Sequence, residues 1–186
     1  MDSQKSAPSR YSPVAMLLHW LIAIAVIANW RLAEGAEHAS KAEAQQIMGT
    51  HMALGMTIFT LAVLRLAVRH IQKPPPLASH LKSWEVVLAR ITHALFYVLL
   101  FALPILGWVA MSSYGSPINM FGWFEWPALP VPQDKETAEA IFGVHHLLGV
   151  AMVLLMALHI LAVLKHTLFD RDGNIFRMLP FGQPKA

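Results

Sequence analysis

The sequence contains no cysteine, and charged residues make up only 13% of its 186 positions. The absence of cysteine excludes disulfides, thiolate metal sites and covalent haem attachment through a Cys-x-x-Cys-His motif. A soluble domain usually carries about 25% charged residues, so the low share here indicates a protein that lies in membrane lipid. The formal net charge of +3 is modest, and the basic residues cluster beside apolar runs, so no nucleic-acid partner is expected.

Four apolar runs reach the roughly 20 residues that a helix needs to cross a bilayer. They cover about residues 14–33, 47–69, 91–112 and 141–166. Period-two alternation is absent, which favours helices over membrane strands. The first run is longer than the core of a typical signal peptide, so we expect a retained helix. The sequence therefore predicts an all-α integral membrane four-helix bundle, with residues 1–186 forming one domain.

Charge in the connections predicts the orientation of the bundle. The end of the second run and the connection to the third carry five basic residues against one Glu85, whereas the other two connections are mainly acidic. The basic residues are Arg65, Arg69, Lys73, Lys82 and Arg90. By the positive-inside rule, both termini are expected to be cytoplasmic. The longest connection, about residues 113–140, holds five aromatic residues and four prolines. This composition predicts a folded cap on the external membrane surface.

Four histidines lie at matched depths in the apolar runs: His19, His51, His145 and His159. A helix turns about 100° and rises about 1.5 Å per residue, so His145 and His159 face the same way at levels roughly 21 Å apart. His51 and His145 lie about four residues in from the external side, and His19 and His159 lie about five and seven residues in from the cytoplasm. Histidine inside a membrane is costly and typical of functional sites. We therefore expect His51 to pair with His145, and His19 with His159.

These pairs predict two haem sites. Two imidazoles on facing helices can supply both axial ligands of a haem iron, which is the ligation of an electron carrier. His146 is rotated about 140° from His159, so His145 is the expected ligand. Gly55 and Gly149 each follow a predicted ligand by four residues, on the same helix face. They either leave room for a porphyrin or let neighbouring helices approach closely.

Two more histidines border the predicted helices on the cytoplasmic side. His93 opens the third run and His166 closes the fourth. Histidine titrates near neutral pH and can donate hydrogen bonds to quinone carbonyls, so both are candidate quinone contacts. A plain interfacial position explains them equally well. His166 lies only about 10 Å beyond His159, which is too close for a third haem.

Several short motifs then carry a resemblance over about residues 10–180. They are HW at 19–20, GTHMALG at 49–55, HALFYVLLFALPILG at 93–107, LHILAVLKH at 158–166 and RMLP at 177–180. With these motifs the sequence resembles the bacterial cytochrome b561 family, four-helix di-haem cytochromes of the inner membrane. The resemblance implies two haem b groups on the four histidines paired above, and electron exchange with ubiquinone. One branch of the family oxidises superoxide outside the membrane, and its likeness implies that His93 and His166 lie beside the quinone.

Three functions stay open at this point. The first is an oxidoreductase that passes electrons from superoxide or a periplasmic redox protein to ubiquinone. A positive patch would attract superoxide, but the external candidates Arg31, Lys41 and Lys135 are outnumbered by carboxylates. The second is a cytochrome b anchor subunit of a periplasmic dehydrogenase or hydrogenase. The third is a non-haem transporter of zinc or copper, which predicts carboxylate ligands inside the helices, where the sequence shows none.

Overall fold

The computed structural model describes residues 10–77 and 81–183. The remaining parts of the predicted domain, residues 1–9, 78–80 and 184–186, lie outside the described residues. Four long helices dominate: α1 (Pro13–Glu37), α2 (Lys41–Ile71), α3 (Ser83–Ser113) and α4 (Lys135–Leu164). All four are long and apolar enough to cross a membrane. The predicted all-α four-helix membrane fold is thus confirmed.

Three kinds of short element complete the described chain. Between α3 and α4 lie two strands, β1 (Ile118–Met120) and β2 (Phe124–Trp126). After α4 the chain continues as a π-helix, η1 (Lys165–Asp170), and a short 3-10 helix, η2 (Asn174–Met178). π-Helical turns are rare and are frequently found at functional sites.

The helices extend beyond the apolar runs because polar residues cap their ends. At the start of α3, Glu85 accepts a hydrogen bond from the backbone N–H of Lys82 at 3.0 Å, so this helix begins at Ser83 and not near residue 91. At the start of α4, Asp134 accepts hydrogen bonds from the hydroxyl and the backbone N–H of Thr137. These bonds hold the pKa of the Asp134 carboxyl below its usual range. Capping satisfies N–H groups that have no partner within the helix.

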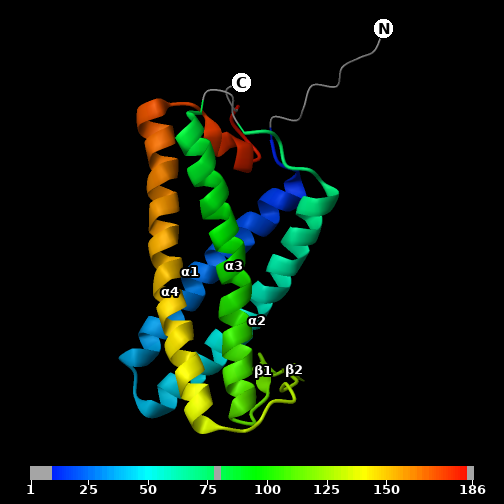
Figure 1. Ribbon diagram of the computed structural model, residues 1–186, viewed down its shortest axis with the longest axis vertical. Helices are drawn as coiled ribbons and strands as arrows, with labels where there is room; N and C mark the ends of the chain where they lie inside the picture. The colour runs from blue at the N-terminus through cyan, green and yellow to red at the C-terminus, as the bar shows by residue number, and fades with distance from the viewer. Residues whose placement is uncertain (1–9, 78–80, 184–186) are drawn as a thin grey trace.

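The helices form two neighbouring pairs, α1 with α2 and α3 with α4, which meet mainly through α2 and α3 (Figure 1). Both described ends of the chain lie at one end of the bundle, together with the end of α2 and the start of α3 (Figure 1). This end is called the terminal end below. The α1–α2 turn and the two strands lie at the opposite end, which is called the hairpin end.

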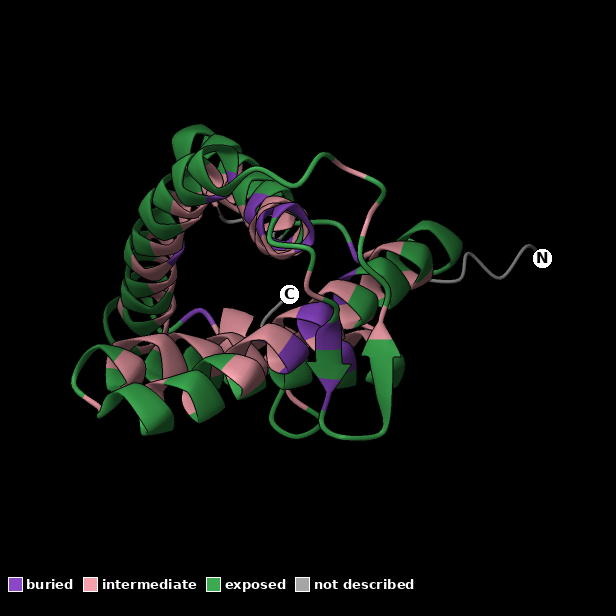
Figure 2. Cartoon of the chain, turned by 90° about the horizontal axis from the view of Figure 1, so that it is seen from below, coloured by how far each residue is buried: buried purple, intermediate pink, exposed green. Residues whose placement is uncertain are grey.

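A small apolar core lies between these two ends. It receives side chains from all four helices: Ile22, Ile58, Ala62, Leu99, Leu100 and Met152. Met152 lies seven residues from His145 and seven from His159, so the core separates the two histidine levels. Elsewhere the helices bury few residues, and most of the helical surface is exposed or partly exposed (Figure 2).

The β1–β2 hairpin packs against the middle of α2. The strands pair antiparallel, and Ile118 and Met120 of β1 pack in a buried cluster with Met56 of α2. Trp123, in the turn between the strands, is 89% exposed. The sequence predicted a folded cap in this connection but gave no sign of the strands.

Replacing Met56 with alanine is expected to destabilise the hairpin end by about 2–5 kcal/mol, since it opens a cavity beneath the hairpin. Met56 is 1% exposed and is among the largest fully buried side chains of the described residues. The matched control is Met48→Ala on the same helix, where the side chain is 36% exposed. Thermal unfolding of the detergent-purified variants measures the difference, and equal melting temperatures would contradict this packing role.

Candidate functional site

The structure brings the first predicted histidine pair together. His51 of α2 and His145 of α4 have ring centroids 6.1 Å apart, with the ring planes at 74°. Both side chains are partly buried, whereas the neighbouring His146 is exposed. The inward position of residue 145 agrees with the helical rotation argued from the sequence.

Each ring of this pair is oriented by a backbone carbonyl on another helix. His51 Nδ1 lies 3.0 Å from the carbonyl oxygen of Asn29 on α1, and His145 Nδ1 lies 2.9 Å from that of Leu103 on α3. A carbonyl oxygen only accepts, so Nδ1 carries the proton in both rings and Nε2 keeps its lone pair. Metal-bound histidines almost always make such a contact through their other nitrogen. The contacts of Asn29 and Leu103 could not be predicted from the sequence, because every residue type has a backbone carbonyl.

The pair has the dimensions of a bis-histidine metal site. A bond from a metal ion to an imidazole nitrogen is about 2 Å long, so two rings on one ion have centroids roughly 6 Å apart. The observed separation of 6.1 Å matches this spacing, and Nε2 of each ring keeps the lone pair that an iron would need. The residues present therefore fit a haem with two axial histidines.

The glycines near this pair have different surroundings. A Cβ on Gly149 would meet nothing within 4 Å, so space is open beside it. A Cβ on Gly55 would contact the Asn29 amide at 3.7 Å, which places Gly55 in the close contact between α1 and α2. Gly107 of α3, which was not predicted as a site residue, faces the His145 ring, since a Cβ there would lie 3.6 Å from its Cε1. Room for a porphyrin remains a prediction at Gly55 and Gly149.

The second histidine level, nearer the terminal end, holds three imidazoles. The His159 ring lies 5.9 Å from the His93 ring and 5.4 Å from the Phe96 ring, by centroids. The His19 ring contacts Trp20 beside it on α1, at 5.3 Å. His19 also interacts electrostatically with both His93 and His159. The structure therefore gathers the second pair in one region but sets His93, and not His19, in ring contact with His159.

The position of His93 corrects the sequence interpretation. His93 was expected at the membrane border because the third helix was predicted to begin near residue 91. The contact between the His93 and His159 rings instead puts His93 at the level of the second histidine pair. Its Nδ1 lies 2.7 Å from the carbonyl oxygen of Ala89, as in a ligand whose tautomer is fixed. His93 is thus a rival of His19 for the place opposite His159.

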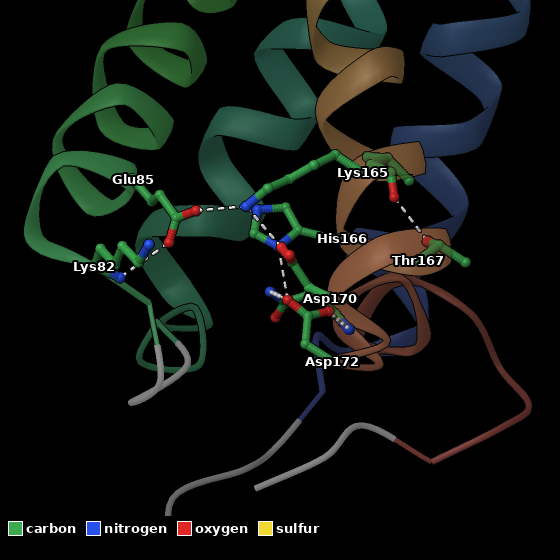
Figure 3. Close-up of polar contacts among 9 residues, drawn as sticks. Lys82, Glu85, Lys165, His166, Thr167, Asp170 and Asp172 are labelled. Atoms are coloured by element: carbon green, nitrogen blue, oxygen red, sulfur yellow. Dashed lines mark hydrogen bonds and ion pairs between the residues drawn. The ribbon is translucent and has the colours of Figure 1, made fainter.

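His166 lies in a charged network at the terminal end (Figure 3). Its Nδ1 lies 2.7 Å from a carboxylate oxygen of Asp172 and 2.9 Å from one of Asp170. The adjacent Lys165 bridges Asp170 and Glu85, with its Nζ 2.7 Å from an oxygen of each. The network joins the start of α3 to η1 and to the segment that follows it.

Part of this network has the donor set of a metal site. Glu85, His166 and Asp170 offer ligand atoms within 4.8 Å of one another. The ammonium group of Lys165 is already paired with both carboxylates of this set. The arrangement is therefore that of an ion-pair network that holds η1 on α3, with His166 between two carboxylates.

Comparisons with known proteins agree with the histidine pattern. Residues 10–181 match the model of the family described as prokaryotic cytochrome b561. The chain is similar to cytochrome b561 homolog 2 of Escherichia coli, with 31% identity over 94% of this chain and 93% of that protein. It is also similar to a probable superoxide oxidase of Yersinia pestis, with 27% identity over 92% of this chain and 96% of that protein.

Proposed function

The chain belongs to the prokaryotic cytochrome b561 family, and from this membership we propose a quinone-linked electron carrier with two haem b groups. One haem would lie between His51 and His145, and the other between His19 and His159. A haem with two axial histidines exchanges single electrons and keeps no open position for oxygen. The observation that carries the proposal is the His51–His145 pair, with its ring separation of 6.1 Å. The family and the four helices that are long and apolar enough to span a membrane fit a multi-pass protein of the bacterial inner membrane.

The two proposed haem levels would form a path for electrons across the membrane. His145 and His159 lie on one face of α4 at levels roughly 21 Å apart, so electrons can pass from one side of the bilayer towards the other. Basic residues are concentrated at the terminal end, and acidic residues at the hairpin end. By the positive-inside rule we place the terminal end in the cytoplasm and the hairpin end in the periplasm.

Ubiquinone is the proposed electron partner at the terminal end. His93 lies beside His159, and a quinone there would receive electrons from the nearest haem. Reduction of a quinone also consumes protons, which histidine can supply near neutral pH. His166, which lies between the carboxylates of Asp170 and Asp172, is the second candidate quinone contact at this end.

The proposed electron donor acts at the hairpin end. Likeness to a probable superoxide oxidase supports superoxide, but the cations there are largely neutralised. Arg31 pairs with Glu34 at 2.5 Å, and Lys135 pairs with Glu139 at 3.6 Å. A surface of this charge does not attract a small anion. A periplasmic redox protein is the second candidate donor, supported by the exposed aromatic hairpin around Trp123.

A reduced-minus-oxidised spectrum of the purified protein tests the proposal. We expect a b-type α band and a pyridine haemochrome assay that gives about two haems per chain, since two bis-histidine sites are proposed. Absence of haem, or a metal bound without a porphyrin, would refute the electron-carrier function. Mixing the loaded protein with superoxide and a soluble quinone then tests the donor, because only a superoxide oxidase forms quinol without a second protein.

A further inference from the structure

Arg65 repeats on α2 the spacing that separates the two histidines of α4. It follows His51 by 14 residues, as His159 follows His145. Fourteen helical residues return to nearly the same face, roughly 21 Å further along the axis. Arg65 therefore presents its side chain on the face of α2 that carries His51, at the level of His19 and His159.

The contacts of Arg65 agree with this placement. Its Nη1 donates a hydrogen bond of 2.6 Å to the carbonyl oxygen of Ala15 on α1, one helical turn before His19. Arg65 also interacts electrostatically with both His19 and His93. The side chain is partly buried. A guanidinium group thus lies within the terminal-end histidine level.

No carboxylate of the described residues balances this charge. The Ala15 carbonyl is the one hydrogen-bond partner of Arg65 within residues 10–77 and 81–183, and it is neutral. Arg65 faces a small pocket without an acidic residue, lined by Tyr11, Ala15, Arg65, Arg69, Gln72, Pro74 and Tyr97. The pocket adjoins a cavity of about 360 Å³ that adds Arg10 and Lys73 to its lining.

A cation at this depth in a membrane is costly unless an anion pairs with it. The pocket therefore suits an anionic group that reaches inwards to the histidine level. The edge of a haem carries propionate carboxylates, and a haem bound at His19 and His159 would bring them to this depth. The planar fork of a guanidinium group matches a carboxylate with two parallel hydrogen bonds.

We propose that Arg65 binds a propionate carboxylate of the terminal-end haem, with Arg69 as a second cation towards the cytoplasm. Arg69 follows Arg65 by four residues, on the same helix face, and its guanidinium carbon lies 5.9 Å from the centre of the Tyr97 ring. The proposal rests on the haem sites of the proposed function. It assigns Arg65 two effects: retention of this haem, and a higher reduction potential, because a nearby cation favours the state with the extra electron.

Arg65→Gln tests the assignment, with Arg90→Gln as the matched control. Arg90 is exposed on α3 at the same end of the bundle, so both variants lose one positive charge. From Arg65→Gln we expect haem to pass to an apoprotein acceptor at least about tenfold faster than from the wild type, because one partner of a charge pair is removed. A redox titration should show one haem at a lower potential, whereas Arg90→Gln should match the wild type.

Two further variants make the outcome decisive. Arg65→Lys keeps the charge but not the two-pronged hydrogen bonding, and we expect an intermediate rate of haem loss. If Arg65→Lys loses haem at the wild-type rate, the proposal is overturned, even if Arg65→Gln does not accumulate. Unchanged haem reduction potentials in Arg65→Gln overturn it as well. His19→Ala separates this failure from that of the proposed function. If His19→Ala loses a haem while both Arg65 variants behave like the wild type, the haem site stands and only the propionate contact is refuted.

Discussion

Replacing His51 with alanine is expected to remove the haem at the hairpin end and to leave the other haem in place. The variant loses one of two axial ligands, and His145 alone holds the iron on one side only. We therefore expect about half of the reduced-minus-oxidised α-band absorbance to be lost, since one of two bis-histidine sites is removed. The haem-to-protein ratio of the purified variant, measured by pyridine haemochrome, gives the same number independently.

The neighbouring histidines of α4 supply the controls for this experiment. His145→Ala should reproduce the effect of His51→Ala, because both rings belong to the pair with 6.1 Å between centroids. His146→Ala should leave both haems bound, since His146 is exposed and makes no ring contact with His51 among the described residues. A spectrum of His51→Ala that equals the wild type would refute the ligand pair.

The sequence predicted the four helices but not where they begin and end. Apolar runs of about 20 residues define the part of a helix that lies in lipid. Apolar runs do not show how far a helix continues into polar turns outside the lipid. At α2 this polar start depends on a capping box of Ser40 and Glu43. Depth alone likewise predicted His93 at the membrane border, whereas its contact with the His159 ring depends on how α3 packs against α4.

The candidate site shows a similar division. Residue type, face and depth were enough to bring His51 to His145, since these properties follow from helical geometry. The carbonyl contacts of Asn29 and Leu103 depend on how α1 and α3 pack against the other helices. Because every residue has the same backbone groups, the sequence does not indicate which carbonyls make such contacts. The sequence does show that Arg65 lies 14 residues from His51. Its positive charge, however, entered only the prediction of which end of the bundle is cytoplasmic.

Comparison of His19→Ala with His93→Ala decides which residue completes the second haem site. The sequence depth favours His19 on α1, whereas the structure sets the His93 ring 5.9 Å from His159. We expect His19→Ala to lose the terminal-end haem, and with it quinone reduction, because His159 would be left as a single ligand. His93→Ala is expected to keep both haems and to reduce quinone at least about tenfold more slowly, as a lost general acid–base group typically lowers rates by about 10²–10⁴-fold. Haem content and quinol formation are measured on the same preparations.

If His93 is the haem ligand, the results expected for His19→Ala and His93→Ala are reversed. Loss of haem from His93→Ala, with full haem content in His19→Ala, would assign the second site to α3 and α4, the helices that already pack as a pair. His19 would then be the residue free to contact the quinone, on the side where Arg65 donates its hydrogen bond to Ala15. His159→Ala is the common reference, because it removes the ligand shared by both arrangements and must lose the terminal-end haem in either case.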